Sequence, residues 1–138
     1  MILSGNEFKK RQLGVAVVGS GRMGSHRARL ASLHPAVSYL VVGDINEDQA
    51  RKLAEASKAN GYSTDNFELI NDPRVDVVIV STPEDQHRDS VEAAIMAGKS
   101  VLVEKPLALT IDDGDRLSKL AQEKGVDLRI GYSQRFLQ

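Results

Sequence analysis

The chain lacks cysteine and tryptophan, and it has only three phenylalanines and three tyrosines among its 138 residues. Without cysteine it can form no disulfide, thiolate metal site or cysteine nucleophile. So few aromatic rings argue against a base-stacking platform for single-stranded nucleic acid. An excess of positive charge is also missing, since 18 Lys and Arg face 19 Asp and Glu for a net charge of −1. A dedicated nucleic-acid binder needs a basic surplus, so we expect no nucleic-acid partner.

Long apolar runs are absent as well. No stretch approaches the roughly 18 consecutive apolar residues of a membrane span. Residues 1–11 are too polar for a signal peptide. Hydrophobic residues make up 41% and charged residues 27% of the chain, as in a globular domain. We therefore expect a cytoplasmic protein of one domain, with no membrane partner.

From residue 13 onward, short apolar runs alternate with helical patterns. The runs are apolar on both faces, which is typical of parallel strands covered by helices on both sides. We expect strands at 13–18, 37–42, near 62–63, at 75–80, 100–103 and 128–132. Helices are expected after the first strand and at 46–60, 85–97 and 110–125. The alternation predicts an α/β fold: a Rossmann-type, doubly wound parallel sheet of about six strands in three α/β/α layers.

Capping residues mark the ends of these helices. Asn46 and Thr110 each precede a helical pattern as N-caps. Gly98 and Gly125 follow the second and third of the later helical patterns, where C-terminal caps prefer glycine.

A glycine-rich turn, Gly19-Ser20-Gly21-Arg22-Met23-Gly24, joins the first strand to the first helix. It has the pattern G-x-G-x-x-G, in which Gly19 makes the tight turn and Gly21 lets a pyrophosphate approach bare backbone. Gly24 allows the helix to pack against the strand. The N-terminus of the helix then offers free N–H groups and a positive dipole end to phosphates.

An acidic residue follows at the distance that a dinucleotide site requires. Asp44 ends the second strand, 20 residues after Gly24. A carboxylate there accepts hydrogen bonds from the hydroxyls of an adenosine ribose and repels a 2′-phosphate, so we expect NAD rather than NADP. The open alternatives are a solvated strand-end role for Asp44 and an ordinary exposed position for Arg22 instead of a phosphate contact.

Two other nucleotide-binding classes use similar glycines. A triphosphatase loop needs Gly-Lys-Ser/Thr after its phosphate-binding turn, but Ser25-His26 follow Gly24. Gly98-Lys99-Ser100 has that triplet, but it lacks the preceding glycine and is followed by a strand. A methyltransferase stays open as an alternative, although Val17-Val18 stand where it would carry an acid.

Polar clusters follow three later strands, at 81–87, 104–106 and 131–136. Ligands in open α/β sheets bind beyond the carboxyl ends of the strands. We therefore expect Thr82, His87, Lys105 and Arg135 to surround one crevice. Each cluster also has an ordinary alternative: Glu104 and Lys105 as a surface ion pair, and His87 as a helix-start residue.

In order and spacing these motifs resemble the glucose–fructose oxidoreductase/inositol dehydrogenase (Gfo/Idh/MocA) family. They are Gly-x-Gly-Arg-Met-Gly, Thr82-Pro83-x-x-x-His87, Glu104-Lys105-Pro106 and Gly131-Tyr132-x-x-Arg135-Phe136. Glu-Lys-Pro after a strand is the most specific of them. The resemblance covers residues 13–136 as the family's NAD(P)-binding domain and leaves residues 1–12 as an N-terminal extension.

The resemblance implies a nicotinamide-dependent oxidoreductase that acts on a sugar, cyclitol or related polyol. Lys105 is the implied catalytic residue, which assists proton transfer or polarises the reacting oxygen beside the nicotinamide. A cis peptide bond between Lys105 and Pro106 is also implied. The implied cofactor-binding residues are Gly19, Gly21, Arg22, Met23, Gly24, Asp44, Thr82, Pro83, His87, Glu104, Lys105 and Arg135.

The chain also departs from the family. Glu84 stands where relatives often have a small polar residue, and Ser133-Gln134 replace a commoner Asn-Arg. Family enzymes continue into a second α/β domain that holds the substrate and builds the oligomer interface. We therefore expect this chain to bind dinucleotide without turnover, and the full-length protein to be a candidate homo-oligomer.

Two further functions stay open. Some family members use the nicotinamide transiently in hydrolysis or elimination, and a non-catalytic dinucleotide sensor would keep Asp44 and the glycines. Lys105 favours an enzyme, because a sensor needs no lysine at the nicotinamide. We expect no metal site, because His26, His34 and His87 share no ligand spacing.

Overall fold

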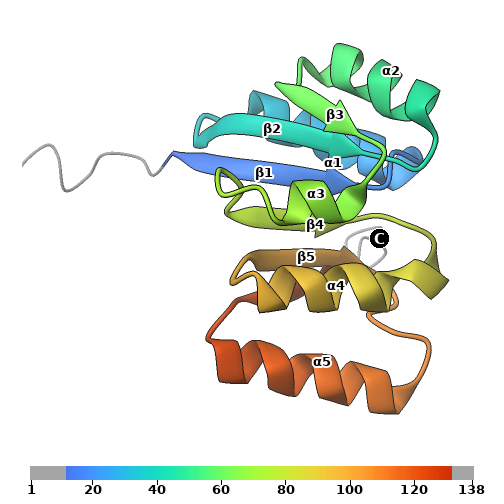
Figure 1. The fold of residues 1–138 in the computed structure, drawn as a ribbon, viewed down its shortest axis with the longest axis vertical. Helices are drawn as coiled ribbons and strands as arrows, with labels where there is room; N and C mark the ends of the chain where they lie inside the picture. The colour runs from blue at the N-terminus through green and yellow to red at the C-terminus, as the bar shows by residue number, and fades with distance from the viewer. Residues whose placement is uncertain (1–11, 132–138) are drawn as a thin grey trace, which may run out of the picture.

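A computed structural model describes residues 12–131, in which strands and helices alternate. In chain order the elements are β1 (Leu13–Val18), α1 (Arg22–Leu33), β2 (Val37–Gly43), α2 (Glu47–Ser57), β3 (Gly61–Ser63), α3 (Asn66–Ile70), β4 (Val77–Val80), the 3-10 helix η2 (Glu84–Gln86), α4 (His87–Met96), β5 (Ser100–Glu104), α5 (Ile111–Lys124) and β6 (Leu128–Gly131). All strand pairs are parallel, in the order β3-β2-β1-β4-β5-β6 (Figure 1). The predicted Rossmann-type fold is confirmed.

The sheet is buried on both faces, which explains its almost continuous apolar strands. In β1, Val15 and Val17 pack with α1 and α2, whereas Ala16 and Val18 pack with α3, α4 and α5 on the other face. These four side chains are at most 5% exposed. Fully burying a valine contributes about 1.5–3 kcal/mol, so this central strand anchors both layers.

The predicted caps at Asn46, Thr110 and Gly125 are confirmed, whereas the C-cap of α4 is Ala97, and the expected cap Gly98 is the next residue. The side chains of Asn46 and Thr110 each accept a hydrogen bond of 3.1 Å from the backbone N–H three residues later. Gly98 and Gly125 follow α4 and α5 with positive φ angles of 75° and 67°. These are left-handed conformations that glycine adopts without steric cost.

Some boundaries differ from prediction. Helix α2 ends at Ser57, earlier than expected, because Lys58 takes a left-handed conformation with φ of 55°. The short helix α3 was not predicted; Asp65 begins it by accepting hydrogen bonds from two backbone N–H groups. Strand β4 begins at Val77 rather than at residue 75, and α4 begins at His87 rather than at residue 85, directly after η2.

Two sequence predictions can be compared with the structure only within residues 12–131. No helix within residues 12–131 is long and apolar enough to cross a membrane. Arg135 and almost all of the expected extension 1–12 lie outside this range, so the domain boundaries, like the cytoplasmic location, stay predictions.

Candidate functional site

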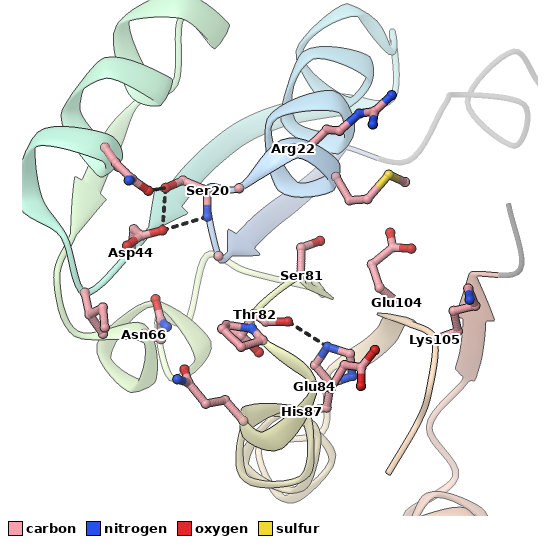
Figure 2. A pocket seen from close by; sticks show the side chains of 17 residues that line it. Ser20, Arg22, Asp44, Asn66, Ser81, Thr82, Glu84, His87, Glu104 and Lys105 are labelled. Atoms are coloured by element: carbon pink, nitrogen blue, oxygen red, sulfur yellow. Dashed lines mark hydrogen bonds between the residues drawn. The ribbon is translucent and has the colours of Figure 1, made fainter. Parts of the chain in front are cut away.

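A cavity of about 510 Å³ opens beyond the carboxyl ends of β1, β2, β4 and β5 (Figure 2). Ser20 and Asp44 lie at one end, Glu104 and Lys105 at the other, with Thr82 between them (Figure 2). The cavity is lined by Gly19, Ser20, Gly21, Arg22, Met23, Asp44, Ile45, Gln49, Asn66, Ser81, Thr82, Pro83, Glu84, Gln86, His87, Glu104 and Lys105. Of the predicted site residues within 12–131, all but Gly24, which is buried behind the turn, line this one space; Arg135 lies outside the described residues.

The three glycines of the turn meet different surroundings. Gly19 has φ of +95°, and a Cβ there would lie 2.5 Å from the carbonyl of Ser81. A Cβ on Gly24 would lie 1.8 Å from the carbonyl oxygen of Gly19. Around Gly21, by contrast, a Cβ would meet nothing within 4 Å. The turn therefore closes tightly against β4 and α1 but leaves open space over Gly21, at the uncapped start of α1.

Asp44 follows β2 and is held by three hydrogen bonds. Its Oδ2 accepts from the Ser20 backbone N–H at 2.9 Å and from the Ser20 hydroxyl at 2.5 Å (Figure 2). Its Oδ1 accepts from the Asn46 N–H at 2.8 Å. Burial raises the pKa of the Asp44 carboxyl, but these hydrogen bonds outweigh it and hold the pKa below its usual value. Asp44 is therefore ionised at neutral pH.

Three buried oxygens in the cavity wall have no hydrogen-bond partner among the described residues. They are Asn66 Oδ1, Ser81 Oγ and Thr82 Oγ1. Leaving a buried polar group unpaired costs about 1–3 kcal/mol, and folded proteins contain few such groups. Their gathering in one cavity indicates a wall arranged for a polar ligand, and the donor and acceptor set fits a dinucleotide.

His87 joins two turns of the cavity wall. The residue is 1% exposed, and its Nε2 lies 2.8 Å from the Thr82 carbonyl oxygen (Figure 2). Its Nδ1 lies 2.6 Å from the Pro106 carbonyl oxygen. Both ring nitrogens thus contact main-chain oxygens, so the ring has no nitrogen left for a ligand. The Lys105–Pro106 peptide bond is cis, as predicted.

Glu104 pairs with a residue that the sequence analysis missed. Arg27, on α1, donates from Nε to Glu104 Oε1 at 2.8 Å, and Glu104 is only 9% exposed. The alternative of a Glu104–Lys105 surface pair is therefore wrong. Lys105 is exposed and forms no ion pair within residues 12–131. No motif marks Arg27, which precedes Glu104 by 77 residues.

The structure adds polar residues to the site that the sequence analysis did not name. Asn66 comes from the unpredicted α3, and Ser81 from a cluster in which it was not singled out. Arg22 is exposed and points away from Asp44 in Figure 2. Within residues 12–131, no three His, Asp or Glu side chains gather to hold a metal ion.

Comparisons with known proteins agree with this geometry. Residues 13–132 match the Gfo/Idh/MocA family model, described as an oxidoreductase family with an NAD-binding Rossmann fold. The scyllo-inositol 2-dehydrogenase (NAD(+)) of Bacillus subtilis is 34% identical over 92% of this chain and 37% of its own length. The myo-inositol 2-dehydrogenase of Thermotoga maritima is 35% identical over 88% of this chain and 36% of its own length.

Solved structures show the same fold. GenD2 from gentamicin A biosynthesis, in complex with NAD, is 38% identical with a TM-score of 0.83, over 88% of this chain and 34% of that protein. Biliverdin reductase from Synechocystis, in complex with biliverdin and NADP+, is 34% identical with a TM-score of 0.82, over 87% of this chain and 38% of that protein. The chain thus spans little more than a third of its relatives' length. It belongs to the Gfo/Idh/MocA oxidoreductase family, as the NAD-binding Rossmann domain.

Proposed function

We propose that the chain is the cofactor-binding domain of an NAD-dependent dehydrogenase that oxidises a hydroxyl group of a cyclitol, sugar or related polyol. One observation carries this proposal. A single cavity holds an ionised carboxylate, Asp44, at one end and Lys105 at the other, and among residues 12–131 neither Lys105 nor the three buried oxygens between them has a partner. The similarity to two inositol dehydrogenases supports the substrate class.

The preference for NAD rests on Asp44. A carboxylate accepts hydrogen bonds from ribose hydroxyls and repels the 2′-phosphate of NADP. The relatives do not decide the matter, because one solved structure contains NAD and another NADP+. The low pKa of Asp44 keeps its negative charge, and hence the repulsion, through the neutral pH range.

The pyrophosphate is assigned to the turn at residues 19–24. The space over Gly21 admits it, and the uncapped start of α1 offers N–H groups and a positive dipole end. Met23, Thr82 and Pro83 line the path towards Lys105. Arg22 and Arg135 stay predictions as cofactor contacts, and His87 supports the site through the Thr82 and Pro106 carbonyls.

Lys105 is the proposed acid–base residue. When bound, the nicotinamide supplies the hydride acceptor. The Lys105 side chain has no ionic partner within residues 12–131, so its Nζ, as the neutral amine, is available to accept the proton that the substrate hydroxyl loses when its carbon gives up the hydride. We place the substrate-holding residues and any homo-oligomer contacts in a further part of the protein, which corresponds to the portion of the relatives that this chain does not match. Turnover therefore requires the longer protein.

Calorimetric titration with NAD and with NADP tests the cofactor assignment. We expect saturable NAD binding, weaker NADP binding, and loss of at least about tenfold in NAD affinity in Asp44→Ala, because hydrogen bonds to a charged group are lost. Circular dichroism shows whether the variant folds. A folded wild-type chain that binds neither dinucleotide would refute the proposal. Product analysis with the longer protein then separates oxidation from hydrolysis or elimination.

A further inference from the structure

The hydrogen bonds around Asp44 leave too few acceptor positions for a ribose. An ionised carboxylate accepts about four hydrogen bonds, two on each oxygen. Ser20 fills both positions of Oδ2 with its N–H and its hydroxyl, and Asn46 fills one position of Oδ1. An adenosine ribose presents two neighbouring hydroxyl donors. The carboxylate can therefore accept only one of them while these three bonds persist.

The Ser20 hydroxyl oxygen offers the missing acceptor. Its single proton points to Asp44, so both lone pairs are available. The other group near this oxygen, Gln49 Oε1 at 3.5 Å, is itself an acceptor. Within residues 12–131, no protein donor therefore occupies the lone pairs of Ser20. Figure 2 shows the Ser20 side chain beside Asp44, at the same end of the cavity that both residues line.

We propose that Ser20 is a second ligand of the adenosine ribose: one ribose hydroxyl donates to Asp44 Oδ1, and its neighbour donates to Ser20 Oγ, which keeps its own proton on Asp44 Oδ2. This inference rests on the proposed NAD binding and refines it. The ribose hydroxyl, the Ser20 hydroxyl and the charged Asp44 carboxylate then form a chain of hydrogen bonds, and the bonds in such a chain strengthen one another.

The same arrangement makes Ser20 a determinant of NAD preference. A ribose carrying a 2′-phosphate brings acceptor oxygens and negative charge to a place where both the Ser20 lone pairs and Asp44 offer acceptors. The Ser20 hydroxyl can serve that phosphate only by taking its proton away from Asp44. Removing the Ser20 hydroxyl therefore weakens the binding of NAD more than the binding of NADP, so the two dissociation constants become more similar.

The experiment combines one variant with two NAD analogues, which lack either the 2′- or the 3′-hydroxyl of the adenosine ribose. Calorimetry gives the dissociation constants for wild type, Ser20→Ala and Ser32→Ala. The last variant removes a hydroxyl that bonds to the Arg29 carbonyl at the far end of α1, and it controls for the substitution itself. Thermal unfolding checks that each variant is folded.

We expect Ser20→Ala to bind NAD about tenfold more weakly, as expected when a strong hydrogen bond is lost, and Ser32→Ala to bind like wild type. The hydroxyl that contacts Ser20 should matter in wild type but have little effect in Ser20→Ala. Unchanged or tighter NAD binding by Ser20→Ala would overturn the inference. It would also be overturned if, for both analogues, the loss of affinity from the missing ribose hydroxyl were the same in Ser20→Ala as in wild type, because neither hydroxyl would then depend on Ser20.

Other outcomes separate this inference from the proposed function. If wild type binds NAD and Asp44→Ala does not, the cofactor assignment stands whatever Ser20→Ala does. If Ser20→Ala does not fold, the analogues on wild type still decide, because equal affinities for NAD and both analogues contradict a two-hydroxyl site. If wild type does not bind NAD, both proposals fall.

Discussion

The polar groups at the two edges of the sheet differ in whether they form hydrogen bonds within the protein. At the edge where the strands begin, here called the amino edge, Asp72 accepts two side-chain bonds from Arg74 and one from the Tyr39 hydroxyl. Arg74 also lies over the Tyr39 ring, and Lys99 Nζ donates to two backbone carbonyls. At the edge where the strands end, the carboxyl edge, three buried oxygens lack partners among residues 12–131.

This difference separates stability from function. At the amino edge, Asp72, Arg74 and Lys99 are satisfied by groups of the protein, so these side chains have little capacity left for a ligand. The carboxyl edge carries an open glycine turn, together with buried oxygens and a lysine that have no partner in the described part of the chain, and a bound dinucleotide can use all of these. Matched substitutions at the two edges should therefore change different measurements.

Two glycines provide the largest expected contrast. A Cβ on Gly14, at the amino edge, would lie 1.7 Å from the Arg74 carbonyl oxygen, whereas one on Gly21 meets nothing within 4 Å. We expect Gly14→Ala to lose about 3 kcal/mol of unfolding free energy, the upper end for overpacking. Gly21→Ala should keep its stability but bind NAD more weakly, because the methyl group enters the pyrophosphate space. Urea unfolding and calorimetry measure the two effects, and equal stability losses would contradict the contrast.

Asp72 gives the next effect, and it depends on pH. Hydrogen bonds from Arg74, together with one from Tyr39, outweigh burial and lower the pKa of Asp72 to about 2. An unfolded aspartate has a pKa of about 3.9, so the stabilisation is complete above that pH and disappears as pH falls through about 2. We expect Asp72→Asn to lose about 2 kcal/mol at pH 7 and to bind NAD normally. Thermal unfolding measured from pH 2 to 7 should show the stability of wild type falling towards that of Asp72→Asn as the pH approaches 2.

The smallest effects should have opposite signs. Tyr39→Phe removes a satisfied hydrogen bond of 2.8 Å and should lower the unfolding free energy by about 1 kcal/mol. Thr82→Val replaces an unpartnered buried hydroxyl with a methyl group and should raise the stability of the ligand-free chain by about 1 kcal/mol. The same Thr82→Val change should weaken NAD binding. A loss of stability in Thr82→Val would show that its hydroxyl is already satisfied.

The sequence predicted the strands, the caps and most of the cavity wall because those features depend on local patterns. Apolar runs and glycine spacing act within a few residues, so β1 and the turn at 19–24 were recognisable. The role of Ser20 was not recognisable from the sequence, because Ser20 occupies an x position of G-x-G-x-x-G and its role arises only from contact with Asp44. Arg27 was missed for the same reason, because its partner Glu104 belongs to a distant strand.

The ion pair between Arg27 and Glu104 gives α1 a fixed length requirement. The helix begins at Arg22, in the glycine-rich turn at 19–24, and five residues later it presents Arg27 to the strand end that carries Lys105. An inserted residue in this segment would advance Arg27 by about 1.5 Å and rotate it by about 100° around the axis. Its guanidinium would then face away from Glu104. Substitutions along residues 22–27 preserve this spacing, whereas insertions and deletions there do not.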